Sequence, residues 1–151
     1  MATWAEFEAA APRMAASGRE LIYRTPTGEA LLATVRGDGL PQVHPIYLAV
    51  MDGRLLAFIT ATPKAVDLAE DGRYALHTHQ DPAAPHEFLV RGRARAIEDA
   101  ATRAEMAKAW YFKTDETYRL FEFLIERAVL GHRPTADDWP PIYTSWKSPA
   151  A

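Results

Sequence analysis

The stretch LLATVRGDGLPQVHPIYLAVMDGRLLAFIT, residues 31–60, decides the fold class. From Gly28 onward the residues alternate between two faces, which is the period of a β-strand. Two turns interrupt the alternation, GDG at residues 37–39 and DG at residues 52–53, and the second is a strong hairpin signal. The pattern predicts three antiparallel strands joined as a meander, the first from residue 28, then 40–50 and 54–60.

Helix-start signals surround this meander. Thr3 and Glu6 form a capping box, Thr62 followed by Pro63 suits a helix cap and first position, and Asp99 suits a third cap. We expect helices over residues 4–16, 62–69 and 100–110.

Further strands are predicted at residues 73–79 and 86–97, on either side of the proline-rich loop 80–85. Residues 118–131, YRLFEFLIERAVLG, fit a helix face and a strand alternation about equally, so periodicity leaves this segment open. Many short strands with tight turns and few helices favour a mainly β fold with some α, a small barrel whose ends are covered by helices.

The chain of 151 residues suits a single domain over residues 1–151. Its N-terminal part, residues 1–18, is the first helix, closed near Gly18. The C-terminal segment 132–151 combines prolines with Trp139 and Trp146. Prolines prevent long regular structure, yet large aromatic side chains are seldom left free, so we expect this segment to pack on the body or on a second subunit.

Composition excludes several classes of protein. Lys and Arg total 17 against 20 Asp and Glu, a net charge of −3, which gives no general attraction to nucleic acid. There are no cysteines, so thiolate chemistry and disulfides are absent. No apolar run approaches the roughly 18 residues that span a membrane, and the acidic N-terminus does not suit a signal peptide. We expect a cytoplasmic protein that binds neither membrane nor nucleic acid.

The first candidate site is the step from strand to helix at Thr60-Ala61-Thr62-Pro63-Lys64. A helix start offers free N–H groups and the positive end of the helix dipole, so a phosphate there would gain donors from backbone, hydroxyl and ammonium together. The alternative is that Thr62 only caps the helix and Lys64 is solvated.

The second candidate is His44-Pro45 within a predicted strand. Proline cannot donate to a strand ladder, so it belongs at an edge or a bulge, where backbone groups are free to meet a ligand. His44 beside it can donate a hydrogen bond or carry a charge. An exposed edge histidine without a ligand is the alternative.

Two further clusters carry weaker signals. His77 and His79 lie two apart on a strand, with His86 and Glu87 after the loop, and could share a metal, although the usual three-ligand pattern is missing. The row Arg91, Arg93 and Arg95 puts three cations on one strand face, most simply a solvated face with ion pairs.

The ordered set ATVRGDGLPQVHP, the DG hairpin, FITATPKAVDLAED, RYALHTH and HEFLVRGRARAIED resembles the pyridoxamine 5'-phosphate oxidase-like family of flavin-binding split β-barrels. The resemblance implies about six to seven antiparallel strands with a few flanking helices. It also assigns a strand to residues 119–130, which periodicity alone does not.

By resemblance the protein is a homodimer with flavin mononucleotide (FMN) at the subunit interface. Thr60, Thr62 and Lys64 match the phosphate-binding segment, His44, Pro45, Ile46 and Tyr47 match the strand along ribityl and ring, and Glu87 falls where relatives often have a glutamine near the flavin. Relatives that oxidise pyridoxamine phosphate carry Arg at the position of His44 and Ser-Arg-Lys at residues 62–64, so that particular activity is not expected here.

The sequence thus favours an FMN-binding oxidoreductase that transfers hydride to or from a small organic substrate, with no catalytic side chain named. One alternative is an F420-dependent reductase on the same barrel, using Arg36, Arg54 or the arginine row. Another is a non-enzymatic flavin- or haem-binding protein with a histidine axial ligand from residues 77, 79 or 86. Substrate and reductant are not encoded in any recognisable motif.

Overall fold

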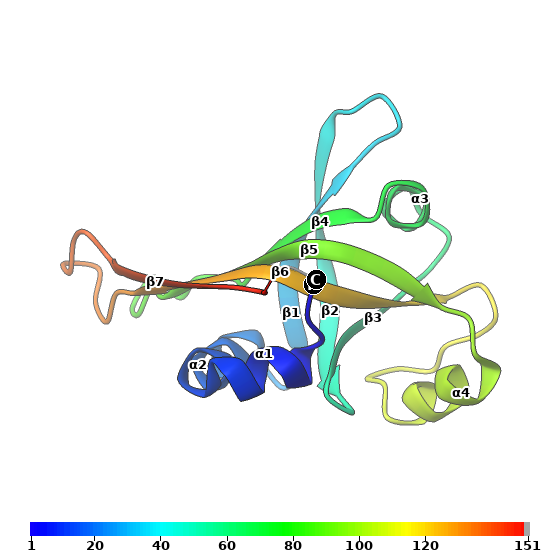
Figure 1. The fold of residues 1–151 in the computed structure, drawn as a ribbon, viewed down its shortest axis with the longest axis horizontal. Coiled ribbons are helices and arrows are strands. Elements are labelled where there is room, and N and C mark those ends of the chain that lie inside the picture. The colour runs from blue at the N-terminus through cyan, green and yellow to red at the C-terminus, as the bar shows by residue number, and fades with distance from the viewer. Residues whose placement is uncertain (150–151) are drawn as a thin grey trace.

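Residues 1–149, which the computed structural model describes, form seven strands and four helices (Figure 1). The strands are β1 (Gly28–Val35), β2 (Pro41–Met51), β3 (Arg54–Ile59), β4 (Arg73–His77), β5 (Glu87–Ile97), β6 (Arg119–His132) and β7 (Ile142–Lys147). They run in the spatial order β3-β2-β1-β4-β5-β6-β7, and β3 also pairs with β6. Six antiparallel strands therefore close a barrel from which β7 extends, which confirms the predicted fold class.

The hairpin between β2 and β3 follows directly from its two turn residues. Asp52 and Gly53 have φ values of 49° and 67°, the left-handed pair that a type I′ turn requires. Met51 pairs with Arg54 across this turn, so the hairpin has the tightest common connection.

Strand β2 changes its surroundings along its length. Its residues from Pro41, opposite Val35, to Leu48, opposite Gly28, pair with β1, whereas only Ala49, Val50 and Met51 pair with β3. The first part of β2 therefore has a free edge within the described residues. Pro41 and Pro45 fall on this part, as expected for residues without an N–H. In Figure 1 the β1–β2 hairpin extends past the barrel beside α3 (Pro63–Glu70).

The predicted N-terminal helix is wrong in its extent. Two helices, α1 (Trp4–Ala10) and α2 (Pro12–Ile22), replace the single helix expected over residues 4–16. The break falls at Ala11, whose φ of −139° is not helical, because a proline disfavours helical geometry in the residue before it. The capping box is confirmed: the Glu6 N–H donates to the Thr3 hydroxyl and the Thr3 N–H donates to the Glu6 carboxylate.

Gly18 does not end a helix but lies buried inside α2. A Cβ at this position would lie 2.4 Å from Cζ of Phe88, which belongs to β5. The missing side chain allows α2 to approach the barrel closely, so this glycine serves packing rather than termination.

We expect Gly18→Ala to lower the free energy of unfolding by up to about 2 kcal/mol, because the added methyl group overpacks the Phe88 ring at a cost of about 1–3 kcal/mol. Helix propensity alone would raise stability by about 1 kcal/mol. Urea denaturation measures the sum. Ala16→Gly, on the exposed side of α2, is the control and should lose only the propensity, about 1 kcal/mol. A more stable Gly18→Ala variant would contradict the packing role.

The core lies in two parts. Inside the barrel, Trp4, Phe7, Phe88, Phe121 and Phe123 are fully or almost fully buried. A second cluster on the outside joins β3 and β6 to α4 (Ala100–Lys108) and the aromatic segment after it, through Phe58, Met106, Trp110 and Leu120.

Strand β6 resolves the segment that periodicity left open. It pairs with β5 along eleven residue positions and contacts β3 and β7 on its other side. Because neighbours cover both faces of its first half, Leu120 through Phe123 are all buried, and the alternation that marks a strand is lost.

The C-terminal segment contains β7, a regular strand among the prolines. Trp146 packs against Phe7 with ring centroids 5.0 Å apart, whereas Trp139 is exposed. The last two residues of the predicted segment 132–151 lie outside the described residues. No helix within residues 1–149 is long and apolar enough to cross a membrane.

Candidate functional site

The start of α3 leaves its first amides uncapped by a side chain. Thr62 takes the cap position in the backbone, but its hydroxyl donates to the carbonyl oxygen of Thr60 at 3.0 Å. The expectation that the Thr62 hydroxyl caps the helix is therefore wrong. The N–H groups of Ala65 and Val66 reach the Thr62 carbonyl, while that of Lys64 is left to an acceptor outside the helix.

His44 faces this helix start from strand β2. Its ring lies in the row of β2 side chains directed inward, with Gln42 and Ile46 on either side. Burial and the Lys64 ammonium lower the pKa of His44, and the Asp67 carboxylate opposes them. The Nε2 atom is buried without a hydrogen-bond partner in the described part of the chain.

Asp67 fixes the helix to the two strands. Its buried carboxylate accepts hydrogen bonds from the Thr34 hydroxyl at 2.7 Å and from the Gln42 amide at 3.0 Å, both at Oδ2. The three residues come from α3, β1 and β2, so this junction sets the distance from the helix start to His44. Sequence reasoning missed it. The available signal was Thr34 in an otherwise apolar row of the first strand, which marks a polar group that needs a buried partner.

The outer face of β2 forms a second feature, a hollow of about 260 Å³ lined by Glu29, Pro45, Ile46, Tyr47 and His79. Tyr47 lies against two aromatic rings of the segment after α4, with centroid distances of 6.1 Å to Tyr111 and 5.9 Å to Phe112. The hollow therefore has a largely apolar wall, with one carboxylate and one imidazole at its edge.

Glu87 lies apart from the start of α3. It begins β5 opposite Gly131, where its carboxylate accepts from Gln80 at 3.5 Å and contacts the Tyr143 hydroxyl, whose pKa it raises. α3 lies near the opposite end of the β4–β5 pair, where the Ala94 N–H donates to the Gly72 carbonyl oxygen. The structure brings His44 to Lys64 and places Pro45, Ile46 and Tyr47 on the adjoining hollow. Glu87 lies two residues before Leu89, the cross-strand neighbour of His77.

The remaining histidines are engaged with their surroundings. His77 Nδ1 lies 2.7 Å from the Thr78 carbonyl, and His86 stacks on His132 with centroids 4.9 Å apart. The backbone N–H of Arg133 donates to His86 Nδ1. In residues 1–149, no three His, Asp or Glu side chains gather as a metal site would require.

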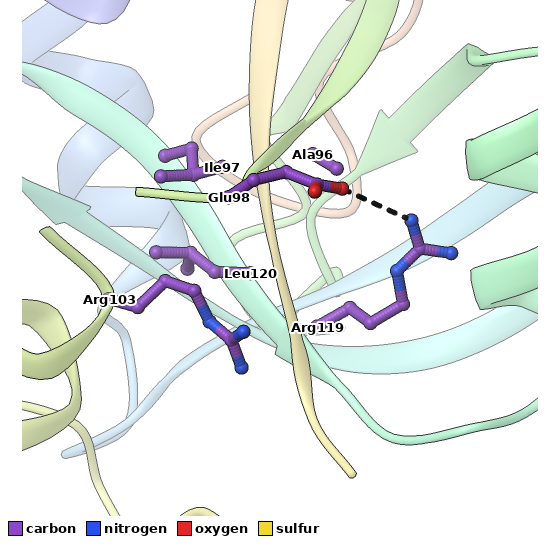
Figure 2. A pocket seen from close by; sticks show the side chains of 6 residues that line it. All are labelled: Ala96, Ile97, Glu98, Arg103, Arg119 and Leu120. Atoms are coloured by element: carbon purple, nitrogen blue, oxygen red, sulfur yellow. Dashed lines mark ion pairs between the residues drawn. The ribbon is translucent and has the colours of Figure 1, made fainter. Parts of the chain in front are cut away.

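The arginine row is largely satisfied internally. Arg95 donates from Nε and Nη2 to one oxygen of the fully buried Glu122, at 2.9 and 2.7 Å, and Arg93 donates to the Asp71 carbonyl. A small hollow of about 100 Å³ nearby contains Arg103 and Arg119 (Figure 2). Their guanidinium groups point apart, Arg119 toward Glu98 and Arg103 away from it, so they do not converge on one anion.

Comparison with known proteins agrees with this geometry. The family model of pyridoxamine 5'-phosphate oxidase matches residues 19–130. The chain belongs to the pyridoxamine 5'-phosphate oxidase-like family. The match includes the β1–β2 hairpin, the start of α3 and the hollow, so the site described above lies within the family domain. The curated proteins give no match to this sequence.

Solved structures share the fold at low sequence identity. A general stress protein 26-related protein of the pyridoxine phosphate oxidase family from Clostridium acetobutylicum is similar with TM-score 0.66 and 14% identity, over 87% of this chain and 92% of the other. The haem storage protein from Vibrio cholerae gives 0.59 and 16%, over 77% and 89%. A haem-binding protein from Mycobacterium smegmatis gives 0.62 and 17%, over 85% of this chain and 57% of the other.

Proposed function

We propose that this member of the pyridoxamine 5'-phosphate oxidase-like family is a flavin-binding oxidoreductase that holds the FMN phosphate at the start of α3. The observation that carries the proposal is the buried, unpartnered Nε2 of His44 beside Lys64, at a helix start without a side-chain cap. A buried polar atom without a partner is costly unless a ligand satisfies it.

The groups at this position fit a phosphate monoester. Lys64 offers an ammonium and a free backbone N–H, the Thr60 hydroxyl lies at the same step, and the helix dipole adds a partial positive charge. The Thr62 hydroxyl would have to turn away from the Thr60 carbonyl to donate to the same phosphate. His44 offers one more donor from the neighbouring strand. Ammonium, hydroxyl, imidazole and amide donors together match the acceptor-rich surface of a phosphate.

The hollow beside β2 suits the rest of a flavin. Pro45, Ile46 and Tyr47 present backbone and apolar side chains along the strand that carries His44, and the free edge of this strand offers further backbone groups. A bound flavin supplies the hydride chemistry itself, so the side chains here have to orient and shield rather than act as acid or base. The substrate would be a small organic molecule.

We expect Lys64→Ala to weaken FMN binding by about 1.5–3 kcal/mol, roughly 10- to 150-fold, because it removes a charge-assisted contact to the phosphate. Fluorescence titration of the apoprotein gives the dissociation constants. Lys108→Ala, at the last turn of α4, is the matched control and should bind FMN like the unchanged protein. Riboflavin, which lacks the phosphate, should bind both variants equally. Unchanged FMN affinity in Lys64→Ala would contradict the assignment of residues 60–64 as the phosphate-binding segment.

Haem is the second candidate, favoured by His79 at the edge of the hollow, where it could serve as an axial ligand. Two proteins of similar fold are haem proteins by name, although their identity to this chain is too low to transfer a ligand. F420 is less favoured, because Arg36 pairs with Asp38 while Arg93 and Arg95 are engaged internally. The visible spectrum after adding each cofactor distinguishes two flavin bands, one deazaflavin band and a haem Soret band.

We also propose that two copies associate through the outer face of β1 and β2. Leu31, Val43 and Tyr47 are exposed there, and Val43 is 64% exposed. A row of apolar residues on one sheet face is typical of an interaction surface rather than of solvent-facing strands. A dimer formed in this way would place its interface beside the hollow, in agreement with a cofactor shared between subunits.

We expect Val43→Asp to convert the dimer to a monomer, because the carboxylate would lose its hydration inside an apolar interface. Sedimentation equilibrium measures the mass directly. Val66→Asp alters a valine of α3 that is 51% exposed and should leave the mass unchanged. A dimer that tolerates Val43→Asp would mean that another face is used.

A further inference from the structure

His44 introduces a group at the phosphate site that can change its charge near neutral pH, because histidine is the side chain whose ordinary pKa lies in this range. An arginine at the same position would carry a fixed charge. The consequence depends on what surrounds the imidazole.

Within residues 1–149, the two charged groups that act on the His44 ring both come from α3. From α3 come the Lys64 ammonium, which disfavours a second positive charge, and the Asp67 carboxylate, which favours one. Asp67 is already engaged by Thr34 and Gln42 at Oδ2. From β1 the cross-strand neighbour of His44 is the apolar Leu32. The Nε2 atom of the imidazole is buried without a hydrogen-bond partner in the described part of the chain, and the Lys64 ammonium disfavours a positive charge on the ring.

We infer that His44 couples phosphate binding at the start of α3 to the uptake of a proton, so that a phosphate monoester binds more tightly as the pH falls. This inference rests on the proposed function. It makes His44 a specificity-determining residue that distinguishes an anionic ligand from a neutral one of the same ring structure.

The direction follows from the two states of the site. Without ligand, burial and the Lys64 ammonium lower the pKa of His44, which favours the neutral ring. A phosphate beside Nε2 favours the charged form and raises that pKa. The gain in affinity is therefore complete below the pKa of the free site, and it is lost as the pH rises through the pKa of the bound site.

The test compares the pH dependence of FMN affinity in the unchanged protein and in His44→Gln, between about pH 5.5 and 8. Glutamine keeps an N–H donor but cannot titrate. Each unit by which the phosphate raises the pKa of His44 should add about tenfold to the affinity at low pH. The phosphate of free FMN also protonates, with a second pKa near 6, and this contribution is the same for both proteins. The inference therefore concerns the difference between the two slopes.

Three outcomes separate the inference from the proposed function. A steeper rise for the unchanged protein with FMN, and equal slopes for the two proteins with riboflavin, would support it. Equal slopes with FMN would overturn it, while a loss of FMN affinity in Lys64→Ala would still uphold the phosphate site. A protein that binds no FMN at any pH would overturn both.

A second measurement does not depend on affinity. The ring protons of His44 can be followed by NMR through a pH titration, and the His44→Gln spectrum identifies its signal among the five histidines. The midpoint should lie below the ordinary histidine value without ligand and should move upward with saturating FMN. A midpoint that FMN does not move would overturn the coupling even if His44→Gln binds weakly for structural reasons.

Discussion

The divergence of strand β3 from β2 is the constraint on which the rest of the structure depends. One edge of β3 pairs with β2 for three residues only, Arg54 to Leu56, and then diverges from it, while the other edge pairs with β6 from Leu56 to Ile59. This divergence closes the barrel and at the same time leaves the first part of β2 with a free edge. α3 follows directly from the end of β3, and Asp67 binds it back to Thr34 and Gln42 on the strands that β3 has left. The candidate site therefore lies where β3 diverges from β2.

The sequence predicts those parts of the fold that are specified locally. Alternation and the DG turn were sufficient for the β2–β3 hairpin, and capping residues located the starts of α1, α3 and α4. Prediction failed where a distant contact decides. A glycine such as Gly18 is typical of a helix end, but here its role is to make room for the Phe88 ring, seventy positions later in the chain. The 118–131 segment lost its alternation because both of its faces are covered, and only the family resemblance identified the strand. The break before Pro12 is also specified locally, because a proline disfavours helical geometry in the residue before it.

The candidate site divides in the same way. Residues 60–64 and 44–47 could be chosen from turn chemistry, proline placement and resemblance, and the structure brings His44 to Lys64. Asp67 could not be found, because an aspartate in a short helix looks like any solvated carboxylate until its two buried partners are known. The role of Glu87 in the site stays a prediction. Glu87 lies two residues before Leu89, the cross-strand neighbour of His77, and so on the side of the hollow rather than of the start of α3.

One side chain outside the site has a consequence for how the barrel moves. The Tyr111 hydroxyl accepts from the Gly28 N–H at 3.0 Å and donates to the Leu48 carbonyl at 2.5 Å, so it is inserted between the first residue of β1 and its partner on β2. The Tyr111 hydroxyl therefore bridges the last residue pair between β1 and β2. The Gly28 amide is shielded from exchange with solvent only while the segment after α4 is seated, and the same segment carries Phe112 against Tyr47. Local opening of the segment after α4 and loosening of the aromatic wall of the hollow are thus the same event. Hydrogen exchange of the Gly28 amide reports how often this event occurs.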